Sequence, residues 1–147
     1  MSALADSTLP FQMEPIPGYP VTAFGWPVVP AGLTELLILL RERYGAALPP
    51  VYITENGCST DDQVAAGAVG DEDRISYLDG HIRAVHKAME AGVDVRGYFV
   101  WSLMDNFEWT EGFHQRFGLV HVDFTTQHRT PKASFTWYHN LIAAQRD

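Results

Sequence analysis

The sequence predicts an α/β fold in which parallel strands alternate with helices. Two short apolar runs, residues 51–53 and 96–101, each follow a stretch whose apolar residues have helical spacing. Successive parallel strands need a long crossover, usually a helix, so this alternation favours parallel pairing. A side chain that can bind or react with a ligand comes at the end of each run: Glu55 follows the first, and Trp101 ends the second. Because barrel enzymes build their sites at the carboxyl ends of their strands, a barrel is favoured over a doubly wound sheet.

The amino-terminal part is predicted to be irregular. Six of the nine prolines lie between Pro10 and Pro30, so residues 1–30 are expected to form an extended, proline-rich loop segment. Residues 31–147 are expected to form one incomplete domain, which opens with a helix that Gly45 ends. The next strand should end at Glu55, and residues 59–70 should form a surface loop. The apolar face of the first helix is Leu33, Leu36, Leu37, Leu40 and Tyr44.

A second helix is expected to be capped by Asp71 or Asp73 and to close at Gly92. Gly80 inside it costs about 1 kcal/mol of helix propensity, which indicates close packing at that point. The inward side of this helix is predicted to carry Ile75, Leu78, Ile82, Val85 and Met89.

The carboxyl-terminal part is predicted to form a hairpin and a last helix. Residues 117–124 alternate enough to be a strand, and residues 125–129 should form the turn. Thr130 and Pro131 are a suitable N-cap and first residue for the helix. Its inward residues are expected to be Phe135, Tyr138 and Ile142.

Composition excludes several classes of function. The net charge is −8 and the few basic residues are scattered, so no basic face for nucleic acid is expected. No apolar run approaches the length of a membrane span, and residues 1–10 do not resemble a signal peptide, so a cytoplasmic protein without a membrane partner is expected. The single cysteine, Cys58, fits a reducing compartment. The histidines and Cys58 show no metal-ligand spacing, so neither a metal nor a cofactor is expected.

Three short segments carry the chemistry: Ile-Thr-Glu-Asn-Gly at 53–57, Trp-Ser-Leu-Met-Asp-Asn-Phe-Glu-Trp at 101–109 and Arg-Phe-Gly-Leu at 116–119. Indole rings stack on the apolar faces of sugars, and carboxylates accept hydrogen bonds from sugar hydroxyls. A carboxylate can also attack an anomeric carbon. In this order and spacing, the segments resemble the C-terminal part of glycoside hydrolase family 1, the β-glucosidase family. The resemblance runs from about residue 25 to residue 142.

The resemblance implies a C-terminal fragment of a (β/α)8 TIM barrel, from its sixth helix through its eighth helix. It implies that Glu55 is the catalytic nucleophile and that Trp101 forms the floor under the sugar ring. Glu108 and Trp109 would hold sugar hydroxyls, and Phe117 would be a pocket wall. Taken singly, these residues have plainer interpretations: a solvent-facing turn residue for Glu55, a rim residue for Glu108 and a core indole for Trp101.

Glu108 also bears on the substrate. The branch of the family that takes phosphorylated sugars has a small polar residue at the matching position, with a lysine nearby. A carboxylate facing a phosphate dianion would be repelled. The resemblance therefore implies an unphosphorylated β-glycoside as substrate.

Two features indicate an incomplete enzyme. The 147 residues are too few for a (β/α)8 barrel, which takes about 200 or more. A retaining glycosidase needs a second carboxylate about 5–5.5 Å from the nucleophile. The family takes it from an Asn-Glu-Pro segment, and this sequence contains no Asn-Glu-Pro.

Three hypotheses follow from this. The chain is part of a β-glycosidase that is inactive until joined to the rest, or a non-catalytic fragment acting as a weak sugar-binding or assembly partner, or a small hydrolase of another design that pairs Glu55 with Glu108. The expected partners are a β-glycoside and the complementary N-terminal part of the barrel, or a second copy bound through open strand edges. The fragment alone is expected to be inactive.

Overall fold

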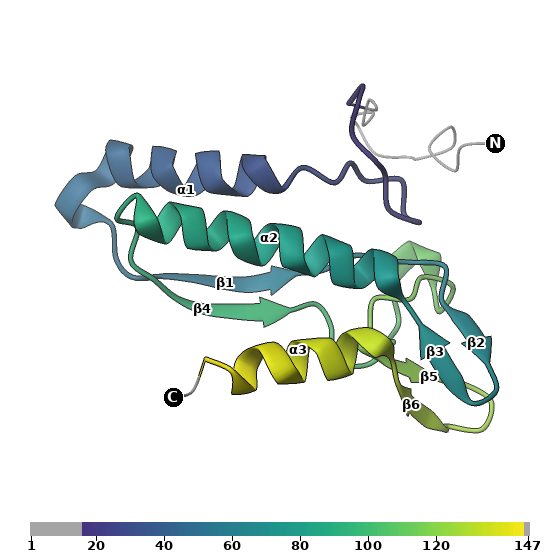
Figure 1. Ribbon diagram of the computed structural model, residues 1–147. Coiled ribbons are helices and arrows are strands. Elements are labelled where there is room, and N and C mark those ends of the chain that lie inside the picture. Colours follow the sequence, from purple (N-terminus) through teal and green to yellow (C-terminus); the bar gives the residue numbers. More distant parts are fainter. Residues whose placement is uncertain (1–15, 146–147) are drawn as a thin grey trace.

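The computed structural model describes residues 16–145, in which helices and strands alternate as expected (Figure 1). The helices are α1 (Pro30–Tyr44), α2 (Glu72–Glu90) and α3 (Ala133–Ala143), with short 3₁₀ turns η2 (Gly45–Ala47) and η3 (Trp109–Glu111). The strands are β1 (Val51–Asn56), β2 (Gln63–Ala65), β3 (Ala68–Gly70), β4 (Val95–Val100), β5 (Val120–Val122) and β6 (Arg129–Pro131).

Strands β1 and β4 pair in parallel, with α2 as the crossover between them. Val51 pairs with Val95 and Asn56 with Val100, although the register shifts between these pairs. Both strands point toward the end of the molecule that carries the β2–β3 and β5–β6 hairpins (Figure 1). The predicted parallel pairing is confirmed, and the two strands end side by side.

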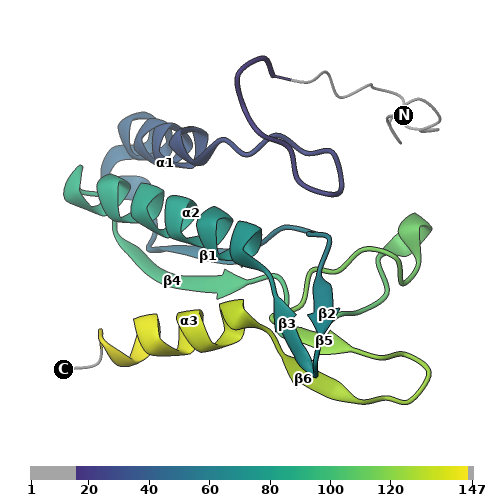
Figure 2. The ribbon, with the colours of Figure 1, turned by 45° about the vertical axis from the view of Figure 1, so that its right-hand side comes forward.

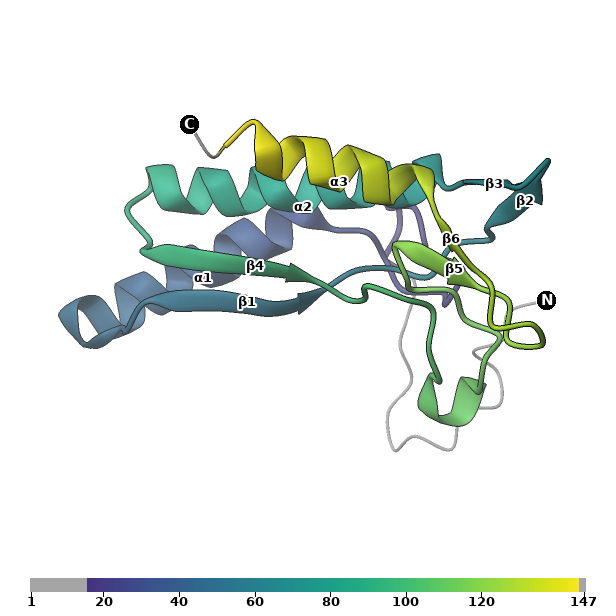
Figure 3. The same cartoon turned by 90° about the horizontal axis from the view of Figure 1, so that it is seen from below.

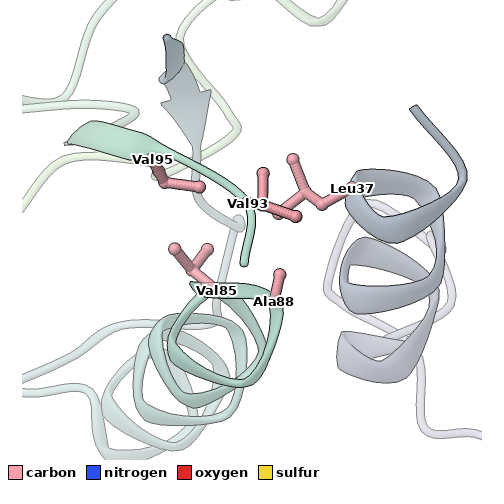
Figure 4. Packing of buried hydrophobic residues seen from close by; sticks show 5 residues of the cluster. All are labelled: Leu37, Val85, Ala88, Val93 and Val95. Atoms are coloured by element: carbon pink, nitrogen blue, oxygen red, sulfur yellow. The ribbon is translucent and has the colours of Figure 1, made fainter. Parts of the chain in front are cut away.

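The helices lie together against the β1–β4 pair. Helix α1 lies beside α2 (Figure 2), and α2 and α3 run along one face of the two strands when the molecule is seen from below (Figure 3). The core between α1, α2 and the start of β4 consists of Leu37, Val85, Ala88, Val93 and Val95 (Figure 4). Among the described residues the sheet does not close into a barrel, since β1 and β4 are its two strands.

The second face of the β1–β4 pair is open. Tyr52 is 53% exposed and Phe99 is 57% exposed. A Cβ on Gly97 would lie 2.6 Å from the Tyr52 ring and 3.2 Å from the Phe99 ring, so both rings lie over this glycine. We call Tyr52, Gly97 and Phe99 the open face.

Two predictions about glycines are confirmed. A Cβ on Gly80 would lie 3.1 Å from Pro30 Cγ, so this glycine does allow α1 and α2 to pack closely. Gly45 follows α1 with φ +52°, a conformation that L side chains rarely adopt, and so ends the helix as expected.

Residues 59–70 were predicted to be a loop, and this prediction is wrong in part. Residues 63–65 and 68–70 form the antiparallel β2–β3 hairpin, with Val64 opposite Val69. Ala66 and Gly67 turn the chain with φ values of +50° and +80°. The strands are too short, and Ala and Gly too weak as strand signals, for alternation to reveal them.

The predicted start of the last helix is also wrong. Thr130 and Pro131 belong to β6, opposite His121 and Val120, and α3 begins at Ala133 with Lys132 as N-cap residue. On α2, Asp71 is the N-cap residue, as predicted, but its side chain makes no capping hydrogen bond. Met89 is 47% exposed rather than inward.

The proline-rich segment is described from residue 16 onward. Residues 16–29 contain no helix or named strand, only an isolated bridge between Val21 and Pro27. Residues 1–15 lie outside the described residues. No helix in the described range 16–145 is long and apolar enough to cross a membrane.

Candidate active site

Glu55 and Trp101 follow neighbouring strands at the same end of the sheet. Glu55 is the next-to-last residue of β1 and is exposed, and Trp101 directly follows β4 and is 36% exposed. The Trp101 N–H donates to the Asn56 carbonyl at 3.0 Å, which joins the two strand ends. The structure therefore brings together the segments that carry the predicted nucleophile and the predicted stacking indole.

Gly57 permits this close approach. A Cβ at Gly57 would lie 1.8 Å from the Trp101 carbonyl oxygen, a contact that no side chain could make without moving the backbone. The glycine of the Thr-Glu-Asn-Gly segment is thus required by the strand next to it, in addition to any role in the turn.

Asn56 is held by a half-buried tyrosine of the neighbouring strand β4. The Tyr98 hydroxyl donates to Asn56 Oδ1 at 2.6 Å, and the Tyr138 hydroxyl donates to the Tyr98 carbonyl at 3.2 Å. Burial raises the pKa of Tyr98 above its ordinary value and the pKa of Tyr77 to about 12. These phenols stay protonated near neutral pH, so the Tyr98 hydroxyl remains a donor to Asn56.

Glu108 carries an unusual carboxylate oxygen. Its side chain is half-buried, and Oε2 is buried with no hydrogen-bond partner within the described part of the chain. The backbone is fixed, because the Glu108 N–H donates to the Gly112 carbonyl at 2.6 Å and the Glu108 carbonyl accepts from the Glu111 N–H at 2.8 Å. A buried, unpaired carboxylate oxygen is costly unless a donor reaches it. Hydroxyl donors of a ligand could fill this place.

Trp109 and Phe117 differ sharply in exposure. Trp109, at φ +41°, is 81% exposed. Phe117 is 3% exposed, and its ring lies 6.0 Å from the Phe24 ring and 6.2 Å from the Trp26 ring between centroids. Trp109 is free to contact a ligand, while Phe117 is packed among aromatic neighbours, and its role as a pocket wall stays a prediction.

Cys58 is buried and unreactive. Its side chain is 2% exposed, and burial raises the pKa of the thiol to about 12. The thiolate, which is the reactive form, is therefore scarce at neutral pH.

Sequence reasoning missed six charged residues that form one connected cluster behind the strand ends. Lys132 Nζ contacts Asp105 Oδ1 at 2.9 Å and also contacts Asp62. The guanidinium of Arg74 contacts Asp62 at 3.0 Å and also contacts Asp71, while Arg116 contacts Asp105 at 3.1 Å. We call this set the ion cluster: Asp62, Asp71, Arg74, Asp105, Arg116 and Lys132. No local pattern in the sequence could have revealed it, because its members come from five separate segments.

Glu55 is exposed, and the two hollows described for residues 16–145 lie away from it. A hollow of about 780 Å³ lies between residues 19–30, the 58–61 segment and the start of α2, and another of about 510 Å³ lies over the two hairpins. Neither is lined by Glu55, Trp101 or Glu108. Within residues 16–145, no group of three or more His, Cys, Asp or Glu side chains is placed to hold a metal ion.

These features define a class: a sector of a β/α barrel in which a carboxylate, Glu55, and an indole, Trp101, lie at the carboxyl ends of neighbouring parallel strands. The chain belongs to glycosyl hydrolase family 1, whose sequence model matches residues 2–147. The fold predicted from the sequence is thereby confirmed as part of the family's TIM barrel.

Three relatives illustrate the match. "Beta-glucosidase A" of Thermotoga maritima is 51% identical over 84% of this chain, and the match covers 27% of that protein. The crystal structure of a psychrophilic β-glucosidase from Micrococcus antarcticus superposes with a TM-score of 0.87 at 53% identity, covering 90% of this chain and 28% of that one. A "6-phospho-beta-galactosidase" of Clostridium acetobutylicum is 41% identical over 85% of this chain and is matched over 26% of its length. The chain thus spans little more than a quarter of these relatives.

Proposed function

We propose that this chain supplies the nucleophile side of a retaining β-glycosidase site for unphosphorylated β-glycosides. The observation that carries this proposal is the placement of Glu55 at the carboxyl end of β1, joined to Trp101 at the end of β4 by the hydrogen bond between their segments. The β-glucosidase relatives support the substrate class.

The chemistry follows from the residue types. The Glu55 carboxylate attacks the anomeric carbon and forms a covalent glycosyl-enzyme while the glycosidic C–O bond breaks. The departing aglycone oxygen takes a proton from a second carboxyl group, which then, as a base, activates the water that releases the sugar. The sequence lacks the Asn-Glu-Pro segment expected to supply this group, so the remaining part of the barrel must provide it.

Binding of the sugar is assigned to the loop after β4. Trp101 would stack on the ring of the sugar, and Trp109 would contact it from the exposed end of the loop. Glu108 would accept hydrogen bonds from sugar hydroxyls, and its buried, unpartnered Oε2 supports this role.

The test of the proposal is complementation. The N-terminal part of the Micrococcus antarcticus β-glucosidase, fused to or mixed with this chain, should restore hydrolysis of 4-nitrophenyl β-glucoside, since it would bring the missing acid. Each part alone should be inactive. Hydrolysis by this chain alone would contradict the proposal and favour a pairing of Glu55 with Glu108.

A second candidate function is a non-catalytic fragment that binds sugar weakly or serves in assembly. The absence of Asn-Glu-Pro from the sequence favours it. The complementation experiment distinguishes the two functions, because a non-catalytic fragment would associate with the N-terminal part without restoring hydrolysis.

Glu108→Ser should separate the two substrate classes. In the restored enzyme, this change should lower kcat/KM for the unphosphorylated glucoside by at least about tenfold, because a charge-assisted hydrogen bond contributes roughly 1.5–3 kcal/mol. Activity on the 6-phosphorylated glucoside should not fall. It should rise, because the change removes a carboxylate that repels the phosphate. The measurement is kcat/KM for both substrates, with Glu90→Gln on the exposed end of α2 as the control. If the wild-type enzyme preferred the phosphorylated glucoside, the role given to Glu108 would be wrong.

A further inference from the structure

Lys132 is a fully buried cation at the centre of the ion cluster. Its side chain is 0% exposed, and Nζ lies between two carboxylates, Asp62 and Asp105. The backbone of Lys132 is the N-cap of α3, but its side chain reaches away from the helix to two loops at the carboxyl ends of β1 and β4. A buried ammonium is tolerated only when carboxylates pair with it, so this position is committed to both partners.

Asp105 fixes the middle of the loop that carries the candidate sugar-binding residues. Its carboxylate accepts hydrogen bonds from the N–H groups of Gly118 at 2.9 Å and Val122 at 3.3 Å, in addition to Lys132 and Arg116. Its own N–H donates to the Val120 carbonyl at 3.0 Å. The loop is therefore held at Asp105 by buried bonds, while the apolar side chains on both sides of Asp105, including Trp101 and Trp109, are exposed.

Asp62 ties the segment after Glu55 to the same cation. It accepts from the Thr60 hydroxyl at 2.8 Å and from the Arg74 guanidinium at 3.0 Å, and the second nitrogen of that guanidinium donates to the Arg116 carbonyl. Asp71, the last carboxylate of the cluster, accepts from the Ser134 N–H at 2.8 Å, which brings the first turn of α3 into the same set of bonds. The segment after β1 and the loop after β4 thus share one anchor.

We propose that Lys132 and Asp105 are positioning residues of the candidate active site. Lys132, through Asp62 and Asp105, holds the Glu55 segment and the 101–109 loop in one fixed relation, so that the nucleophile and the sugar-binding side chains meet the same sugar ring. The catalytic consequence rests on the proposed function, whereas the anchoring itself does not.

The anchoring is tested on the 147-residue chain without any substrate. Lys132→Met keeps the length of the side chain and removes its charge, Asp105→Asn keeps the shape of the carboxylate, and the double variant leaves neither charge. Arg83→Met removes an exposed ion pair with Asp79 on α2 and is the matched control. Hydrogen exchange should rise in residues 57–62 and 101–109 of each single variant, with α1 and the core of α2 unchanged. Unchanged exchange in these two segments, or an equal rise over the whole chain, would overturn the proposal.

The catalytic consequence is measured in the restored enzyme. A misplacement of about 1 Å can cost about 10²-fold in rate, so each single variant should lose kcat/KM for 4-nitrophenyl β-glucoside on that scale, with KM raised. In the double variant, the midpoint of thermal unfolding should recover, because one positive and one negative charge are removed together and the rest of the ion cluster is again balanced, while KM should stay raised. If the unfolding midpoint and KM both returned to their wild-type values in the double variant, the role of the pair would be purely stabilising and the positioning claim would be overturned. If the wild-type fusion is inactive, the proposed function fails while the exchange result still decides the anchoring.

Discussion

Glu55→Gln is expected to lower turnover of 4-nitrophenyl β-glucoside by at least about 10⁴-fold in the restored enzyme, because an amide cannot replace a carboxylate as the attacking group. Binding of the sugar should change little, since the amide keeps the size and hydrogen-bonding shape of the carboxylate. Glu55 makes no hydrogen bond or ion pair to other described side chains, so its replacement should leave the fold intact. The measurement is kcat together with the dissociation constant of a non-hydrolysed glucoside analogue.

Labelling gives an independent check of the same assignment. A 2-fluoro β-glucoside with a good leaving group forms a stable glycosyl-enzyme, and peptide mapping should place the label on Glu55. Glu90→Gln, on the exposed end of α2, should retain full turnover and labelling. A label found on Glu108 or on any other residue would remove Glu55 from the role of nucleophile.

The parts of the fold that depend on local patterns could be predicted from the sequence. Helix α1 between Pro30 and Gly45, strand β1 after Pro50 and the parallel β1–β4 pair all follow from apolar periodicity and from glycine and proline signals. The close packing at Gly80 could also be predicted, because a glycine inside a helix needs a reason.

The errors arose where tertiary contacts override local signals. Thr130 and Pro131 are an acceptable helix start, yet β5 draws them into a strand pair at residues 120–122, and the helix begins two residues later. Asp71 looks like a helix cap, but its carboxylate binds Arg74 and Ser134 instead. Ser134 lies 63 residues after Asp71, and the partners of Thr130 and Pro131 lie in a neighbouring strand, so neither contact is part of the local helix pattern.

The candidate site also has features that local sequence patterns predict and features that depend on tertiary packing. The residue types and their order suggested Glu55, Trp101 and Glu108, but the reason for Gly57 emerges only from the Trp101 carbonyl that faces it. The unpartnered Oε2 of Glu108 and the ion cluster are likewise properties of packing. Charged residues such as Lys132 are usually solvated, so no pattern in the sequence indicates that this one is buried.

The open face and the edges of β1 and β4 are expected to make the chain associate. Among the described residues, β1 and β4 have only each other as sheet neighbours, so each strand has an edge with unpaired backbone groups. Tyr52 and Phe99 add exposed aromatic surface beside these edges. At about 25 cal/mol per Å² of apolar area, a few hundred Å² of such surface amounts to several kcal/mol.

The purified 147-residue chain should therefore form dimers or larger assemblies, and the N-terminal part of a family 1 barrel should replace these contacts. Light scattering after size-exclusion chromatography measures the mass in both cases. Tyr52→Lys combined with Phe99→Lys should shift the chain toward monomer, because two charges on the open face oppose its burial. The same double variant should bind the N-terminal part poorly, since the contact face is shared.

Met89→Lys is the matched control for these substitutions. Met89 is 47% exposed, but it lies on α2, away from the strands, so a lysine there should alter neither self-association nor binding of the N-terminal part. Equal effects of Met89→Lys and the open-face variant would point to a general loss of solubility or to another contact surface. A wild-type chain that stays monomeric at micromolar concentration, with the open face unprotected in hydrogen exchange, would show that neither the edges nor the aromatic residues drive association. The contact of this chain with the rest of a barrel would then have to rest on the helices instead.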